Sequence, residues 1–202
     1  MPHRELTEHP LGLTWESGDT LQRTAHALAD EGRVWLVDPF ADEEALERAR
    51  ALGDIAGVLQ LFVGHNRDAQ AIASRFSAPF LKIPDLVPDS PFSVLNLDKL
   101  VWKERALWWP ERKGLIVAES LGAGRLYAVG PGPVGVHVVR RLLPPGELRS
   151  YRPEHLLMGH GPSIHGEEAT TALNEALDRS LRDIPALAVQ LPGLVRNMRR
   201  QS

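Results

Sequence analysis

The sequence contains no cysteine among its 202 residues. Disulfides, thiol nucleophiles and cysteine-ligated metals are therefore excluded, and histidines and carboxylates are left as the candidate metal ligands. Charge of one sign is not in excess either, because the net charge is only −3. Aromatic residues make up 6% of the chain and are not interleaved with basic residues. We therefore expect no nucleic-acid partner.

Long apolar stretches are also missing from the sequence. No run approaches the roughly 20 residues that a membrane-spanning helix needs. Residues 1–10 are polar and lack the apolar core of a secretion signal, so we expect a cytoplasmic protein with no membrane partner. The length and the apolar content of 43% are typical of one globular domain. We expect that domain to span residues 1–202, with a core over about 11–184 and a looser tail over 185–202.

Apolar runs alternate with amphipathic segments in the first half of the chain. The runs at 34–37 and 58–63 predict buried strands. Between them, residues 42–52 begin with Asp42 as a capping residue and carry one apolar face, which predicts a helix. A helix over 69–76 and a strand over 80–83 follow. This order predicts a largely parallel sheet in which the strands at 34–37 and 58–63 are neighbours.

The pattern changes in the second half of the chain. Apolar runs at 106–109 and 115–118 flank a polar turn and predict an antiparallel hairpin. We interpret 85–98 as irregular and 126–129 as a further short strand. A last apolar run at 156–158 precedes a glycine-rich loop, and an amphipathic helix is expected over 167–183. The elements together indicate an α+β layered domain.

The glycine-rich loop is the first candidate site. His160 lies between Gly159 and Gly161, directly after the predicted strand at 156–158. Ligand sites favour such loops, because the strand end fixes the backbone and glycine lets it approach a ligand closely. His160 is interpreted either as a metal ligand or acid/base group, or as a histidine that binds a neighbouring carbonyl in a tight turn. In the first case, we expect its replacement by alanine to remove function at little cost in stability.

The order of these landmarks resembles that of the metallo-β-lactamase-fold hydrolases. The resemblance rests on the strand at 34–38, the polar loop at 64–68, the hairpin that ends in 117–120 (VAES) and the Gly-His-Gly at 159–161. It implies an αββα sandwich of two mixed β-sheets flanked by helices, with an active site along the edge where the strand-end loops meet. Residues 20–28 fit a helix or a strand by pattern, and the resemblance favours a strand.

The metal-binding motif of that family is only partly matched. When the family's His-x-His-x-Asp-His motif is placed on Asp68, its histidine positions fall on Gly64, Asn66 and Ala69. No histidine occurs from residue 66 to residue 136. Glu119 and His160 match two later ligand positions. A zinc pair needs more donors than these, so we assign no metal ligand set. The Gly-His-Gly-x-x-x-His-Gly pattern at 159–166 resembles a branch of the family that is mainly bacterial.

Seven residues remain as candidates, and all except Asn66 have a structural alternative. His65 is alternatively a loop histidine bound to backbone, and Asp68 the capping residue of the helix at 69–76. Arg67 is alternatively a salt-bridge partner of Asp68 or Glu119, and we expect it to turn toward Asp68. Glu119 is alternatively a solvated carboxylate in a turn, and His165 a residue that stabilises its own loop. The candidate catalytic residues are His160, Glu119, Asp68 and His65, and the candidate ligand-binding residues are Asn66, Arg67 and His165.

Three functions follow as hypotheses. The favoured one is a protein that has lost most zinc ligands, carries no cofactor and binds a small molecule or partner at the former active-site edge. The second is a hydrolase that uses one weakly bound zinc or other divalent metal, held by His160, Glu119 and either His65 or Asp68, with an activated water. The third is a non-catalytic structural or interaction protein. All three predict that the loops at 64–68, 119–124 and 159–165 converge, with His160 close to Glu119.

Overall fold

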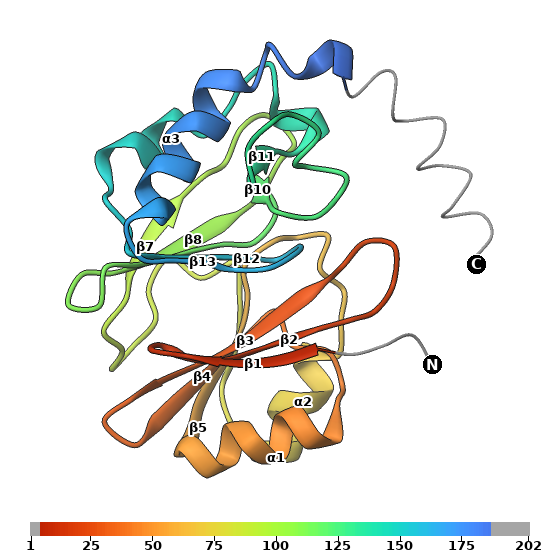
Figure 1. The fold of residues 1–202 in the computed structure, drawn as a ribbon. Coiled ribbons are helices and arrows are strands. Elements are labelled where there is room, and N and C mark those ends of the chain that lie inside the picture. The colour runs from red at the N-terminus through yellow and green to blue at the C-terminus, as the bar shows by residue number, and fades with distance from the viewer. Residues whose placement is uncertain (1–4, 187–202) are drawn as a thin grey trace.

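Two β-sheets pack face to face, and helices cover the outer face of each sheet (Figure 1). The structure is a computed structural model, and it describes residues 5–186. Helices α1 (Glu43–Leu52) and α2 (Ala69–Phe76) lie on the outer side of the first sheet, and α3 (Glu168–Arg179) lies on the outer side of the second (Figure 1). The αββα sandwich implied by the resemblance is therefore confirmed.

The first sheet has six strands in the order β1-β2-β3-β4-β5-β6. Its first four strands pair antiparallel, whereas β4, β5 and β6 run parallel, so the sheet is mixed. The parallel strands are joined by helices, as a parallel connection requires. The elements are β1 (Glu5–His9), β2 (Gly12–Glu16), β3 (Thr24–Asp30), β4 (Arg33–Val37), α1 (Glu43–Leu52), β5 (Asp54–Gln60), α2 (Ala69–Phe76) and β6 (Phe80–Lys82).

The neighbouring strands predicted at 34–37 and 58–63 are found as β4 and β5, joined by α1. Asp42 caps α1, because its side chain accepts a hydrogen bond from the Ala45 amide at 2.9 Å. The predicted end of β5 was wrong by three residues. After Gln60 the chain leaves the sheet, since the Leu61 amide donates to the Asp38 carboxylate and the Val63 amide to the Lys103 carbonyl. The segment therefore crosses toward the second sheet.

The second sheet has five strands in the order β13-β12-β9-β8-β7. Strands β9 and β12 are parallel, and the other pairs are antiparallel, which includes the predicted hairpin of β8 and β9. The elements of this half are β7 (Ser93–Asn96), β8 (Arg105–Trp109), β9 (Gly114–Val117), β10 (Leu121–Gly122), β11 (Gly135–Val136), the short 3-10 helices η1 (Val138–Arg140) and η2 (Gly146–Ser150), β12 (His155–Met158), β13 (Ile164–His165) and α3 (Glu168–Arg179).

Several sequence-based boundaries need correction. Residues 126–129 form no strand, because the amides of Tyr127 and Ala128 both bind the Gly124 carbonyl in a turn. Strand β7 lies in the segment that was interpreted as irregular, and α3 ends at Arg179 instead of 183. Residues 20–28 contribute a strand, β3, as the resemblance implied. Most of the predicted tail, residues 187–202, lies outside the described residues. Within residues 5–186, no helix is long and apolar enough to cross a membrane.

Three apolar clusters explain the four layers. One lies between α1, α2 and the first sheet, a second between the two sheets, and a third between the second sheet and α3. Burial of these side chains is the main force that holds the layers together. Their largest members are Trp15, Leu36 and Leu46 in the first, Trp35, Trp109 and Leu157 in the second, and Leu115, Leu156 and Leu173 in the third.

A chain of hydrogen bonds between neutral histidines crosses from the first sheet to the second. The Leu11 amide donates to Nδ1 of His9, which places the proton of that ring on Nε2, 3.0 Å from Oγ1 of Thr14. The Thr14 hydroxyl lies 2.7 Å from Nδ1 of His26, whose Nε2 lies 3.0 Å from the Met158 carbonyl. Because a carbonyl only accepts, His26 carries its proton on Nε2 and accepts from Thr14. We call these groups the histidine relay.

The histidine relay predicts that acid destabilises the fold. His26 is fully buried, and burial lowers its pKa to about 4. Below its ordinary pKa of 6.5 the unfolded chain gains a proton that the folded chain does not, so the stabilisation present above pH 6.5 is lost as the pH falls toward 4. The loss attributable to His26 is about 2 kcal/mol at pH 5.

Urea unfolding at pH 7.5 and pH 5 checks this prediction. The His26→Gln variant keeps an amide donor for the Met158 carbonyl but has no titrating ring, so its stability is expected to fall less between the two pH values than that of the wild type. His155→Gln serves as the control, since His155 is only partly buried and lies outside the relay. Equal pH dependence in the wild type and His26→Gln would contradict the account.

Candidate functional site

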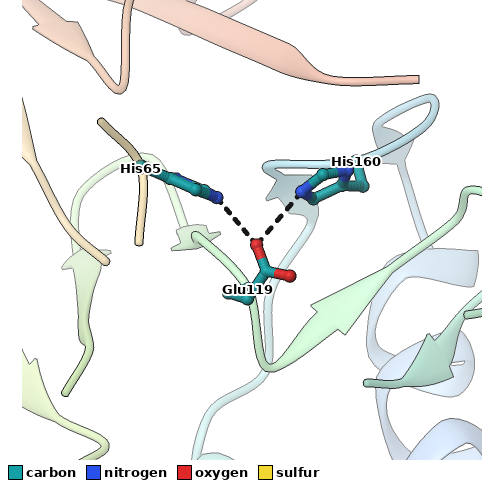
Figure 2. A group of neighbouring side chains, drawn as sticks. All are labelled: His65, Glu119 and His160. Carbon is teal, nitrogen blue, oxygen red and sulfur yellow. Dashed lines mark hydrogen bonds and ion pairs between the residues drawn. The ribbon is translucent and has the colours of Figure 1, made fainter. Parts of the chain in front are cut away.

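Three buried side chains from three loops meet at one edge of the sandwich: His65, Glu119 and His160 (Figure 2). Glu119 lies between the two imidazole rings, and both rings point at the same carboxylate oxygen (Figure 2). Oε2 of Glu119 is 2.7 Å from Nε2 of His65 and 3.0 Å from Nε2 of His160. The predicted convergence of the loops, with His160 close to Glu119, is confirmed.

The strand register explains why two of these residues are neighbours. Strands β9 and β12 are parallel, and Val117 is paired with Met158 at their carboxyl ends. Glu119 and His160 each follow two residues later, so they leave the same edge of the sheet side by side. The close approach of the two loops requires glycine at Gly159, because a Cβ there would lie 2.0 Å from the Ala118 carbonyl oxygen.

The Nδ1 atoms of His160 and His65 each contact an oxygen from a loop next to the first sheet. Nδ1 of His160 lies 2.8 Å from the Leu21 carbonyl, to which it donates. Nδ1 of His65 lies 2.9 Å from Oδ2 of the buried Asp38, as an ion pair whose geometry departs from a linear hydrogen bond. Both rings are thereby oriented with Nε2 toward Glu119, which is how second-sphere acceptors orient histidine ligands of metals.

The second carboxylate oxygen of Glu119 has its own donors. The hydroxyl of Tyr127 donates to Oε1 at 2.6 Å. Nε2 of His137 lies 3.4 Å from the same oxygen, and Nδ1 of that ring accepts from the Val139 amide, so the ring carries its proton on Nε2. Oε1 is thus occupied by neutral donors, and Oε2 is directed at the two histidines.

The charges of the site shift several pKa values. Burial alone would raise the pKa of Glu119, but the bonds from His160 and His65 outweigh it and hold that pKa well below its usual range. Burial alone would lower the pKa of His65, yet the carboxylates of Asp38 and Glu119 raise it. Burial, together with the Glu119 carboxylate, raises the pKa of Tyr127 well above its ordinary value. Glu119 is therefore ionised and Tyr127 is a neutral hydrogen-bond donor at neutral pH.

A small pocket opens beside these groups. Its volume is about 160 Å³. Its polar wall is formed by Glu119, Tyr127, His137 and His160, and its apolar wall by Leu21, Leu126 and Val138. A small molecule in this pocket would therefore touch the carboxylate and three protonatable groups on one side and aliphatic side chains on the other.

The architecture matches solved structures whose sequences differ widely from this one. DIM-1 metallo-β-lactamase aligns over 90% of this chain and 98% of its own, with 14% identity and a TM-score of 0.59. A putative diflavin flavoprotein fragment from Nostoc aligns over 89% and 98%, with 12% identity and a TM-score of 0.62. A protein solved in a di-iron-bound form aligns over 75% and 94%, with 21% identity and a TM-score of 0.51. The chain has the metallo-β-lactamase fold.

Comparison by sequence adds nothing to this assignment, because no family model and no curated protein matches the chain. The site residues follow from the geometry alone. Within the metallo-β-lactamase fold, the three-residue group lies where the strand-end loops meet, which is the edge that the resemblance predicted.

The structure does not bring the other candidates to this group. Asp68 is exposed, accepts from the Ala41 amide at 2.7 Å and makes no capping bond, although it occupies the capping position of α2. Arg67 does not turn toward Asp68, and it donates instead to the carbonyls of Thr24, Asp38 and Gly159. Asn66 is exposed. His165 lies on β13 beside the rings of His9 and His155 and lines a different pocket.

Sequence reasoning missed three residues that build the site. Asp38 was interpreted only as the end of a strand, and Tyr127 was placed in a strand that does not form. Glu104 was not considered, although it is fully buried next to Glu119. The available signal was the pair of charged residues, Glu104 and Arg105, directly before the apolar run at 106–109. His137 accepts a hydrogen bond from the Val139 amide, and it also faces the pocket.

The donor atoms fit a single metal ion. Two imidazole nitrogens and one carboxylate oxygen lie within 4.8 Å of one another, and all three side chains are buried. The Nδ1 acceptors leave each Nε2 available as a ligand atom, and Tyr127 leaves Oε2 of Glu119 available in the same way. Among the described residues, no further histidine or carboxylate joins this group.

Proposed function

We propose that His65, Glu119 and His160 bind one divalent metal ion, such as zinc, and that the protein is a hydrolase acting on a small substrate in the adjoining pocket. The observation that carries the proposal is the convergence of two oriented Nε2 atoms on one carboxylate oxygen. Two histidines and one glutamate are a known ligand set of single-zinc catalytic sites, which keep a fourth position for water. Such an ion lowers the pKa of its water to about 7 and so supplies a nucleophile at neutral pH.

The chain's own residues would bind and orient the substrate. The Nε2 proton of His137, 3.4 Å from Oε1 of Glu119 at the pocket wall, would donate to a substrate oxygen, whereas the single proton of the Tyr127 hydroxyl stays on Oε1 and holds the carboxylate in place. The aliphatic wall of Leu21, Leu126 and Val138 excludes water from one side and favours a substrate with a small apolar group. Asp38 and the Leu21 carbonyl keep the two ligand rings oriented.

A metal-free ligand-binding protein is the second candidate, and one observation favours it. Both carboxylate oxygens of Glu119 already have partners, since Tyr127 occupies Oε1 and the two histidines occupy Oε2. With protons on both Nε2 atoms, the group forms a closed set of charge-assisted hydrogen bonds that needs no cation. In this case the chain has lost the metal chemistry associated with its fold, in line with Gly64, Asn66 and Ala69 at the motif's histidine positions, and the pocket binds a small molecule directly.

Metal content and hydrolysis separate the two candidates. Protein stripped with a chelator and reloaded with Zn²⁺ is expected to hold about one ion per chain and to hydrolyse a small ester such as p-nitrophenyl acetate faster than the stripped protein. Asp68→Asn is the control, because Asp68 lies outside the group. It should bind and react as the wild type does. No retained zinc, together with no metal-dependent hydrolysis, would contradict the proposal and favour the metal-free candidate.

A further inference from the structure

We propose that Glu104 is the positioning residue of this site, and that its buried carboxylate fixes the backbone of Glu119 and the aromatic wall beside the two histidines. The inference rests on the proposed metal-binding function. Glu104 directly precedes β8 in the chain and has no exposed surface.

The carboxylate of Glu104 accepts four hydrogen bonds. Oε1 accepts from the amides of Glu119 at 2.8 Å and Ser120 at 3.0 Å. Oε2 accepts from the hydroxyl of Ser120 and from Nε1 of Trp102, the latter at 2.6 Å. Each oxygen therefore has two donors, and the donors come from two separate segments of the chain.

The two hydrogen bonds to Oε1 of Glu104 hold the backbone of Glu119 beyond the end of its strand. Strand β9 ends at Val117, so the amides of Glu119 and Ser120 lie beyond the ladder of the sheet. Oε1 of Glu104 takes the place of the missing strand carbonyls. Because this bond is made to the backbone of Glu119 itself, a shift of Glu104 would move the carboxylate that both histidines face.

The hydrogen bond from Trp102 to Oε2 of Glu104 holds the aromatic residues that flank the histidines. The ring of Trp102 lies 4.9 Å from the ring of His137 and 4.7 Å from that of Phe62. Phe62 in turn stands edge-on to His65, with the ring centroids 5.3 Å apart. The bond from Trp102 to Glu104 thus fixes one wall of the site, from the pocket side to the ligand side.

The chemistry of the four donors indicates positioning instead of charge pairing. All four are neutral groups: two amides, one hydroxyl and one indole. Burying a carboxylate costs desolvation energy that neutral donors only partly return, so stability alone is a poor reason to place a glutamate there. A carboxylate does, however, offer acceptors on both sides, which is what two pairs of converging donors require.

Glu104→Gln tests this role. One end of the glutamine amide becomes a donor and faces two donors, so two of the four bonds are lost. We expect the dissociation constant for Co²⁺ to rise about 10- to 100-fold, the range found when outer partners of metal ligands are changed. The visible absorption of the Co²⁺-loaded protein should also change, because it reports the ligand geometry and not the stability of the fold.

Leu46→Ala is the matched control, since it weakens the cluster under α1 without touching the site. It should lower the melting temperature and leave both the Co²⁺ affinity and the spectrum unchanged. If Glu104→Gln does not fold, Ser120→Ala removes one donor and keeps Glu104, and a several-fold loss of affinity is expected. Wild-type affinity and spectrum in whichever of these two variants folds would overturn the positioning role alone. A wild type that binds no Co²⁺ would overturn the proposed function and this role with it.

Discussion

His160→Ala is expected to abolish tight binding of a divalent cation by this protein. The variant leaves two donors, His65 and Glu119, where three converge in the wild type. Changes to outer partners of metal ligands cost about 10- to 100-fold in affinity, so the loss of a ligand itself should exceed about 100-fold. Competition with a chromogenic chelator measures the dissociation constant directly.

His165→Ala is the matched control for this result. It removes another histidine of the same glycine-rich loop, but His165 is exposed and lies outside the three-residue group. Its cation affinity should equal that of the wild type. Unchanged affinity in His160→Ala would show that the cation binds elsewhere. The His160→Ala variant should also be less stable than the wild type, because His160 is buried and donates to the Leu21 carbonyl. This differs from the sequence-based expectation of little cost in stability.

Arg67→Met should cause a large loss of stability. Arg67 donates to the carbonyls of Thr24, Asp38 and Gly159, which lie in β3, after β4 and after β12. It therefore joins the two sheets next to the site. A buried acceptor left without its donor costs about 1–3 kcal/mol, and the Gly159 carbonyl keeps the Thr24 amide as a donor. The loss of the bonds to Thr24 and Asp38 should therefore lower the free energy of unfolding by about 2–5 kcal/mol.

Asn66→Ala provides the comparison for Arg67→Met. The two residues are adjacent in the chain and both were candidate ligand-binding residues, but Asn66 is exposed. Its replacement should change the free energy of unfolding by less than about 0.5 kcal/mol. Urea unfolding of both variants measures the difference. Near-equal stabilities would show that the guanidinium does not hold the sheets together, and would restore a ligand-binding role for Arg67.

The predictable part of the fold is the part with strong local signals. Strands β4 and β5 are apolar runs on either side of a helix with a capping aspartate, and β8 and β9 flank a clear turn. Strand β1 is mostly exposed and polar, so it shows no apolar alternation that would predict it. The segment at 126–129 is apolar enough for a strand, but tertiary contacts fold it into a turn that brings Tyr127 to Glu119. The sequence pattern at 126–129 gives no sign of the contact between Tyr127 and Glu119.

The site was predicted in part for the same reason. Glu119 and His160 follow parallel strands, so a strand-end argument places them together. His65 enters in place of Asp68, because two tight turns, from the Asn66 amide to the Gly64 carbonyl and from the Arg67 amide to the His65 carbonyl, redirect the loop. Alignment on a family motif assumes the usual loop path and therefore misplaces both residues. Glu104 acts through partners 15 and 16 residues away, which no local pattern indicates.

A crystal structure of the protein soaked with Zn²⁺, with anomalous data collected on both sides of the zinc absorption edge, tests the central claim most directly. One strong anomalous peak per chain is expected, with Nε2 of His65, Nε2 of His160 and Oε2 of Glu119 each about 2.0–2.2 Å from it. An absence of any peak among these three atoms at saturating zinc would contradict the claim, and so would two peaks in the site.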